Sequence, residues 1–126
     1  PEANEDAVAA NAVAIASRFG AELHALAINP DIPPVSNALS KLLLDTPQMI
    51  RDAEASSRRR GQELLALVKA RAGQAGVVAS VAETAAPLAA IGDVACRHAR
   101  YYDLALLGLE IGNTTARMVA EAVVFG

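Results

Sequence analysis

Short aliphatic segments alternate with helical segments along this 126-residue chain, and this alternation limits the possible folds more than any other feature. The aliphatic segments are residues 21–29, 77–84 and 103–109, and the first and third are apolar on both faces. Two apolar faces are typical of a parallel strand covered by helices on both sides. The sequence therefore predicts a single α/β domain over 1–126, with a three-layer parallel sheet and right-handed crossovers.

Helix-start and helix-stop residues frame the helical segments. A first helix is predicted over 4–19, capped by Asn4 and ended by Gly20. Its inner face comprises Val8, Ala12, Ile15, Ala16 and Phe19. After a proline-rich loop, Ser36 or Asn37 can cap a short helix through Leu44.

Thr46 and Pro47 predict the start of a long helix that runs to about Arg71. Gly61 interrupts this helix, and close packing of the helix against a neighbour would explain a glycine there. Gly73 and Gly76 are predicted to end it.

The last helices flank the third aliphatic segment. Pro87 is predicted to open a helix through about Tyr101, with an inner face of Leu88, Ile91, Val94, Ala95 and His98. Thr114 or Thr115 is predicted to cap the final helix, which continues to about Val124.

Charge and cysteine content narrow the classes of partner. The net charge is −3, which argues against nucleic acid as a partner. The basic run 58–60 is interpreted as the solvated face of the long helix.

One cysteine, Cys96, allows no internal disulfide and suits a cytoplasmic protein. We interpret Cys96 as a small buried side chain and His24 as a hydrogen-bonded sheet histidine. No segment has the apolar length of a membrane span.

The motifs of common enzymes are missing from the sequence, so no catalytic residue is predicted. The chain has two histidines on different elements, and no Gly-x-Ser-x-Gly or His-Glu-x-x-His pattern. No Cys/His cluster has metal-ligand spacing. A phosphoacceptor regulator would need a lysine on a late strand, whereas Lys41 and Lys69 fall in helical segments.

Three phrases resemble the universal stress protein family: "RFGAELHALAI" at 18–28, "ETAAPLAAIGDVACRHARYYDLALLG" at 83–108 and "VAEAVVFG" at 119–126. The resemblance implies a parallel sheet of order 3-2-1-4-5. In that order this sequence supplies strands two, three and four. Because helices begin and end the chain, we expect a strand before Pro1 and another after Gly126, and an omission near 110–113 stays open.

The family's ATP site uses Gly-x2-Gly-x9-Gly-Ser/Thr after the fourth strand. Gly108 matches the first glycine, Ile111 occupies the second position, and Gly112 comes one place late. Arg117 and Met118 stand where the family has glycine and Ser/Thr, and the segment is four residues shorter than the motif. The resemblance therefore implies the branch of the family without the usual ATP motif.

Two functions follow as hypotheses. The first is a non-enzymatic stress-response domain, a homodimer with an interaction role or an unidentified small-molecule ligand, and with no cofactor. The second is an ATP-binding protein with a variant phosphate loop made of Gly108, Gly112, Thr114, Thr115 and the N-terminus of the last helix.

Overall fold

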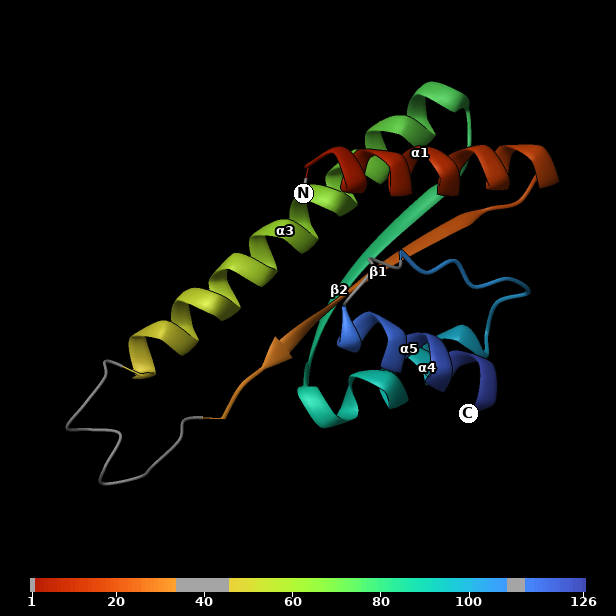
Figure 1. Cartoon of the computed structure of the whole chain (residues 1–126). Coiled ribbons are helices and arrows are strands. Elements are labelled where there is room, and N and C mark those ends of the chain that lie inside the picture. The colour runs from red at the N-terminus through yellow and green to blue at the C-terminus, as the bar shows by residue number, and fades with distance from the viewer. Residues whose placement is uncertain (1, 34–45, 109–112) are drawn as a thin grey trace.

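The computed structural model describes residues 2–33, 46–108 and 113–126 (Figure 1). The described elements, in chain order, are α1 (Glu2–Phe19), β1 (Leu23–Asp31), α3 (Thr46–Ala75), β2 (Ala79–Pro87), the short 3₁₀ helix η1 (Leu88–Ala90), α4 (Ile91–Ala99) and α5 (Thr114–Phe125). The short helix predicted at 36–44 lies outside the described residues.

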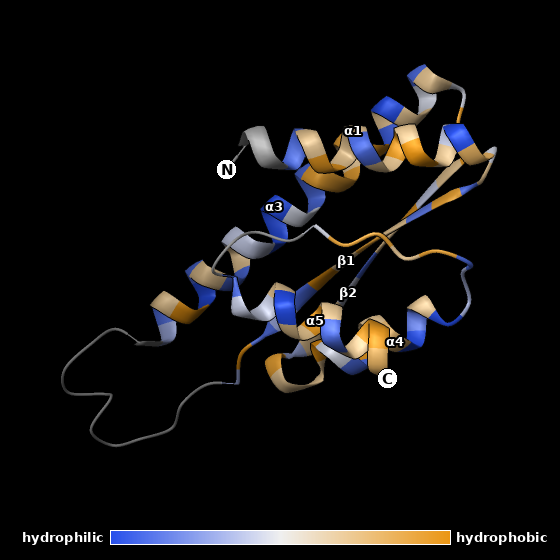
Figure 2. Cartoon of the chain, turned by 45° about the vertical axis from the view of Figure 1, so that its right-hand side comes forward, coloured by the Kyte–Doolittle hydropathy of each residue, from blue (hydrophilic) through white to orange (hydrophobic). Residues whose placement is uncertain are grey.

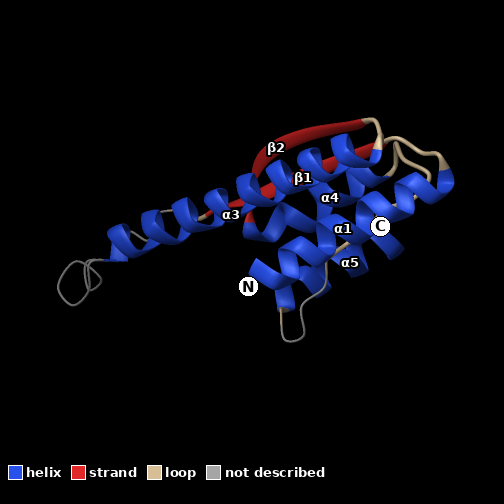
Figure 3. Ribbon diagram, turned by 90° about the horizontal axis from the view of Figure 1, so that it is seen from above, coloured by secondary structure: helices blue, strands red, loops and turns tan. Residues whose placement is uncertain are grey.

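The two strands form a small parallel sheet, which confirms the α/β class. Their register runs from Leu23 opposite Ala79 to Asp31 opposite Pro87. The long helix α3 lies between the strands in sequence, as a parallel pair requires. Figure 1 shows α1 and α3 on one side of the strands and α4 and α5 on the other. In the view from above, β2 lies outermost (Figure 3).

The hydrogen bond from the Leu23 N–H to the Val78 carbonyl, at 2.9 Å, fixes which groups of β1 face β2. Backbone groups of successive strand residues point to opposite edges. The odd-numbered residues of β1 therefore face β2, and His24, Leu26 and Ile28 turn their N–H and C=O groups to the other edge. Pro30 also points to that edge, so its missing N–H removes no bond from the ladder. By the same alternation Pro87 points away from β1.

Small side chains predominate among the buried residues of α1 and α3. The buried residues here are Ala9, Val13, Ala16, Leu65, Val68 and Ala72. An ion pair between Asp6 and Arg71 joins the two helices at their partly exposed rim. Phe19 was predicted on the inner face but is 74% exposed, because it is the last residue of α1 and the chain turns away there.

Glycine ends both helices of this layer. Gly20 has φ +60° and Gly76 has φ +67°, a left-handed conformation that favours glycine. The prediction for Gly20 is confirmed. Gly73 was wrongly predicted to contribute to the end of α3, since the helix continues to Ala75. The start of α3 at Thr46 is confirmed.

Two other predicted helix boundaries are wrong. Asn4 lies inside α1, which begins at Glu2, because Glu and Ala before it are good helix formers. The α4 helix ends at Ala99 rather than Tyr101, and the next three backbone N–H groups each bond back to a carbonyl of the helix. His98, predicted to face inward from α4, is exposed, whereas Ile91 and Ala95 are buried.

The predicted strand at 103–109 is not formed over the residues that the structure describes. Residues 104–108 have no regular secondary structure, and residue 109 lies outside the described part. A strand exists only through pairing with a neighbour, and no backbone hydrogen bond joins residues 104–108 to either described strand. Figure 2 shows the segment as a mainly hydrophobic trace, and Leu104, Leu106 and Leu107 remain 58%, 43% and 40% exposed.

Candidate functional site

The start of α5 carries two of the predicted phosphate-binding residues, Thr114 and Thr115, and Asn113 caps it. Asn113 Oδ1 accepts the N–H of Ala116 at 3.0 Å, and the Asn113 carbonyl accepts the N–H of Arg117. The prediction that Thr114 or Thr115 caps this helix is therefore wrong. Asn113 has the extended backbone that a cap requires, whereas both threonines already lie in the first turn of the helix.

The two threonines and the N-terminus of α5 could contact an anion only to a limited extent. Thr114 is exposed and Thr115 is half-buried. The first N–H groups of an α-helix have no acceptor within the helix, so this terminus retains donors and a partial positive charge. Gly112 lies outside the described residues, so the predicted set of four residues is seen only in part.

Gly108 packs against the helix α1. A Cβ atom added at Gly108 would lie 3.2 Å from Val8 Cγ2 of α1. Of the described glycines, only Gly20 and Gly76 have positive φ. The small size of Gly108 thus permits close approach of residues 104–108 to α1, which differs from the backbone role of a phosphate-loop glycine.

The residues at the other motif positions, Arg117 and Met118, lie within α5. The guanidinium of Arg117 donates to Glu121 Oε1 at 2.9 Å, one turn further along the helix, and its side chain is 82% exposed. Met118 is 47% exposed, and its thioether side chain has no N–H or O–H to donate to a phosphate. Neither side chain adds a donor to the turn.

The sequence did not reveal a polar cluster in the carboxyl-terminal half of the sheet. Asn29 is only 5% exposed, and its amide donates to Glu83 Oε1 at 2.6 Å. Gln62 of α3 donates to the other oxygen of Glu83 at 3.2 Å. Asn29 was detectable, because asparagine is rare in strands and the carboxyl ends of parallel strands commonly form ligand sites.

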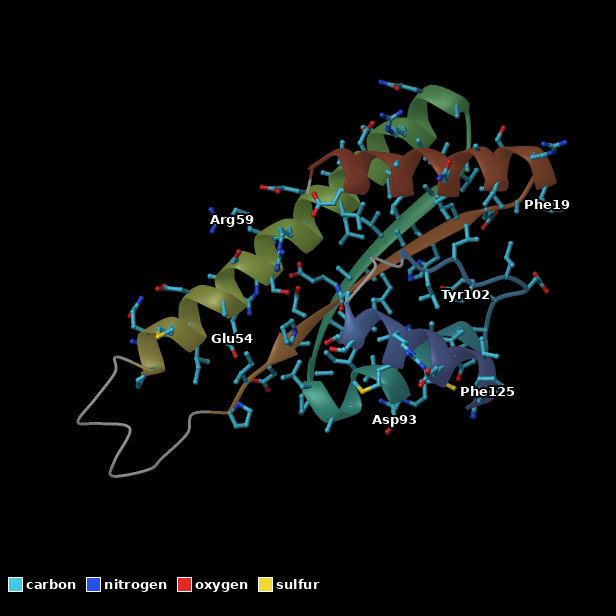
Figure 4. The ribbon with its side chains drawn as sticks, in the orientation of Figure 1. Phe19, Glu54, Arg59, Asp93, Tyr102 and Phe125 are labelled. Atoms are coloured by element: carbon cyan, nitrogen blue, oxygen red, sulfur yellow. The ribbon has the colours of Figure 1, made fainter. Side chains whose placement is uncertain are left out.

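Gly61 allows α3 to approach this cluster. Its added Cβ would lie 3.2 Å from Ala27 Cβ and 3.4 Å from Asn29 Oδ1. The prediction that close packing explains this glycine is confirmed. Further along α3, Glu54 Oε1 accepts the N–H of Ile32 at 2.7 Å and ties the end of β1 to the helix (Figure 4). These bonds make the cluster a structural joint between helix and sheet.

His24 is a hydrogen-bonded sheet histidine, as predicted. Its Nδ1 lies 2.7 Å from Ser80 Oγ on β2. The ring also stacks on Tyr102, with centroids 5.3 Å apart and planes 10° from parallel. His24 therefore links the start of the sheet to the segment that follows α4.

Two shallow hollows lie among the described residues. One, of about 520 Å³, lies between α1 and α3 and includes Val13, Arg18 and Arg71. The other, of about 300 Å³, lies between α4 and α5 and is lined by Asp93, Cys96, Arg97, Arg100, Ala122 and Gly126.

Cys96, in the second hollow, is 8% exposed, which confirms that it is buried. The described parts of the chain contain no cluster of His, Cys, Asp or Glu suited to a metal ion. None of their helices is long and apolar enough to cross a bilayer. The basic side chains of residues 58–60 are exposed, as predicted.

Comparison with known proteins adds no assignment. No protein-family model, curated protein or solved structure significantly matches the chain. The functional argument therefore depends on the residues and on the geometry described above.

Proposed function

We propose that this chain is a non-enzymatic interaction domain of the universal stress protein type, from the branch that lacks tight ATP binding. The observation that carries the proposal is how the segment into α5 is used. Gly108 packs on Val8, and Asn113 already accepts the Ala116 N–H. A triphosphate cradle needs glycines whose bare backbone faces the ligand. The residues here engage other parts of the chain.

The family topology is part of this proposal. The parallel neighbours β1 and β2 correspond to strands two and three of the order 3-2-1-4-5, which are adjacent in that order. Residues 103–109 would correspond to the fourth strand, which is not a neighbour of strand two in that order. The lack of pairing between β1 and residues 104–108 is compatible with this arrangement. Self-association as a homodimer belongs to the same proposal.

Thermal denaturation with Mg²⁺-ATP tests the proposal. A ligand at 100 times its Kd stabilises a folded protein by about 2.7 kcal/mol, which gives a clear rise in Tm. We expect no rise at 1 mM Mg²⁺-ATP, with Mg²⁺ alone as the control. A rise at submillimolar ATP would overturn the proposal.

The alternative function, ATP binding through a variant phosphate loop, is favoured by one observation. Thr114 is exposed at a helix N-terminus, where N–H donors and the helix dipole attract anions. If ATP does raise the Tm, Thr114→Ala should reduce the rise, since it removes a hydroxyl donor from the site. Thr84→Ala, in β2, serves as the control because it removes a hydroxyl at a different place.

A further inference from the structure

The hollow between α1 and α3 has the size of a small-molecule site. Its volume is about 520 Å³, and common ligand pockets have volumes of about 300–1,000 Å³. The described residues that line it lie between 10 and 18 on α1 and between 71 and 75 on α3. Figure 1 shows these two helices lying together beside the strands. The hollow is therefore formed by a pair of helices whose own packing creates it.

The apolar part of the hollow consists of small side chains. Val13 is only 5% exposed, and the other apolar members are Ala10, Ala14 and Ala75. Alanine side chains leave room between the two helices for an added group. A short aliphatic chain placed there would exchange water for contact with methyl groups, which is favourable.

The polar part of the hollow consists of hydrogen-bond donors. Its members are the hydroxyl of Ser17, the guanidinium groups of Arg18 and Arg71, and the side-chain amide of Gln74. None of the lining residues is acidic, although the whole chain has a net charge of −3. Guanidinium groups bind carboxylates and phosphates through charge-assisted hydrogen bonds. The hollow therefore favours a ligand with an anionic group.

Arg18 is the more available of the two cations. Its side chain is exposed, and within the part of the chain that the structure describes it forms no ion pair. The end of α1 does not need it as a cap, because other groups already bond the last carbonyls. The carbonyl of Ala16 accepts the N–H of Ala21 at 2.9 Å, and that of Ser17 accepts the N–H of Gly20 at 3.2 Å. The charge of Arg18 is thus left for a ligand.

Arg71 is held in position by Asp6. Its Nε and one of its Nη atoms both donate to Asp6 Oδ1. The second Nη forms no bond to that carboxylate, and the side chain is 37% exposed. Arg71 therefore adds an oriented donor to the hollow, while Arg18 supplies the charge that no neighbour neutralises.

We propose that this hollow binds an amphipathic organic anion, a short aliphatic chain with a carboxylate or phosphate head group. Arg18 binds the head group, with Ser17, Gln74 and Arg71 as further donors, and the aliphatic chain packs against Val13 and the alanines. Both head groups offer oxygen acceptors to the same donors. The inference goes beyond the proposed function, because it does not involve the segment into α5.

Methyl NMR of the whole chain locates the ligand. The probes are octanoate and octyl phosphate, and 1-octanol is the control without charge. With both anions we expect saturable shifts at the apolar members of the hollow, with a Kd in the millimolar range for ligands this small. The reporting methyl groups are those of Ala10, Val13, Ala14 and Ala75. The methyl signal of Ala122, in the hollow between α4 and α5, should stay unchanged.

The same titrations contain the outcomes that would overturn the proposal. These are the absence of saturable shifts, shifts confined to Ala122, and binding of 1-octanol as tight as that of the anions. If the anions bind as expected, the tighter of the two identifies the head group as carboxylate or phosphate.

Reversing the charge of Arg18 gives an independent test. Arg18→Glu removes a charge-assisted donor and adds repulsion, so octanoate should bind at least about tenfold more weakly. Arg58→Glu is the matched control, since it makes the same change of charge at an exposed arginine of α3 outside the hollow. It should weaken binding less than about twofold, because solvent and salt screen a distant exposed charge. Equal weakening in the two variants would contradict binding in the hollow.

Circular dichroism of both variants separates loss of binding from loss of folding. Should Arg18→Glu unfold, the methyl shifts of the unmodified chain still decide the question. A rise in Tm with ATP would remove the proposed function and leave this site intact. Failure of both anions to bind would remove the site and leave the proposed function intact.

Discussion

Two aliphatic segments of similar composition have different fates in this molecule. Residues 23–28, "LHALAI", lie in β1, whereas residues 104–107, "LALL", form no strand. The first segment has a parallel neighbour in β2 and a helix, α3, packed through Gly61. The second has no ladder partner among the described residues and leaves its leucines exposed. Strand propensity thus becomes strand structure only where a partner supplies hydrogen bonds and burial.

The regions around these two segments also differ in the number of bonds and buried residues that hold them in place. Side-chain bonds join α1, α3, β1 and β2 at several points, including Asp6 with Arg71 and Asn29 with Glu83. The α5 helix packs chiefly against α4, and it has no fully buried residue. We therefore expect α5 and residues 104–108 to open at lower free energy than α1, α3 and the sheet.

Truncating one leucine in each region gives the largest expected contrast. Leu65→Ala removes a side chain that is 9% exposed and should lower the free energy of unfolding by about 3 kcal/mol. Leu106→Ala removes one that is 43% exposed and should cost less than about 1 kcal/mol, since water already covers much of it. Urea denaturation measures both values. Equal losses would contradict the difference in packing.

Gly61→Val tests the joint between α3 and the sheet. The added Cβ alone lies 3.2 Å from Ala27 Cβ, and its two methyl groups need space that the strand occupies. We expect a loss of about 2 kcal/mol in urea denaturation. Gly73→Val on the same helix is the control: its Cβ meets no heavy atom within 4 Å, so stability should hold or rise slightly. A similar loss at both positions would show that the close contact with Ala27 is not the cause of the effect.

Asn29→Ala tests the buried amide. It removes the donor to Glu83 Oε1 and should lower the free energy of unfolding by about 1.5 kcal/mol. Gln62→Ala removes the longer, exposed bond to the same carboxylate and should cost less than about 0.5 kcal/mol. Thermal unfolding ranks the two variants. If Gln62→Ala were the more damaging, the joint would depend on α3 rather than on Asn29.

Asn113→Ala should have a smaller effect than Asn29→Ala, and a local one. Loss of the helix cap costs about 1 kcal/mol, and it should speed hydrogen exchange of the α5 amides while exchange in α3 is unchanged. Asn113→Ser keeps a capping oxygen and serves as the control. Faster exchange across α3 as well would mean that the two regions unfold together.

Local signals in the sequence predicted much of the fold. Thr46 and Pro47, Gly20 and Gly76 are helix-boundary residues, and the structure places boundaries at or beside them. The prediction of a strand at 103–109 failed, because strand pairing depends on a neighbouring strand. The composition of the segment itself does not show whether such a neighbour exists. Asn113 was overlooked in favour of the threonines beside it, because several good capping residues stood together.

The candidate site was less predictable than the fold. Arg117 and Met118 showed in the sequence that the phosphate motif is incomplete. The contact of Gly108 with Val8 could not be predicted, because it joins residues a hundred positions apart. The Asn29 and Glu83 bond likewise depends on strand register, which follows from the assembled sheet. Such contacts cannot be predicted from patterns among residues that are close together in the sequence.

Pro30 and Pro87 turn outward at almost the same level of the two strands. Neither outer edge of the sheet offers an amide donor at this level. A strand added at either edge would therefore lack a backbone hydrogen bond near the carboxyl end of the sheet. Any further strand would pair with the amino-terminal and middle parts of β1 or β2. The carboxyl end of a parallel sheet is also the end at which such sheets usually bind small molecules.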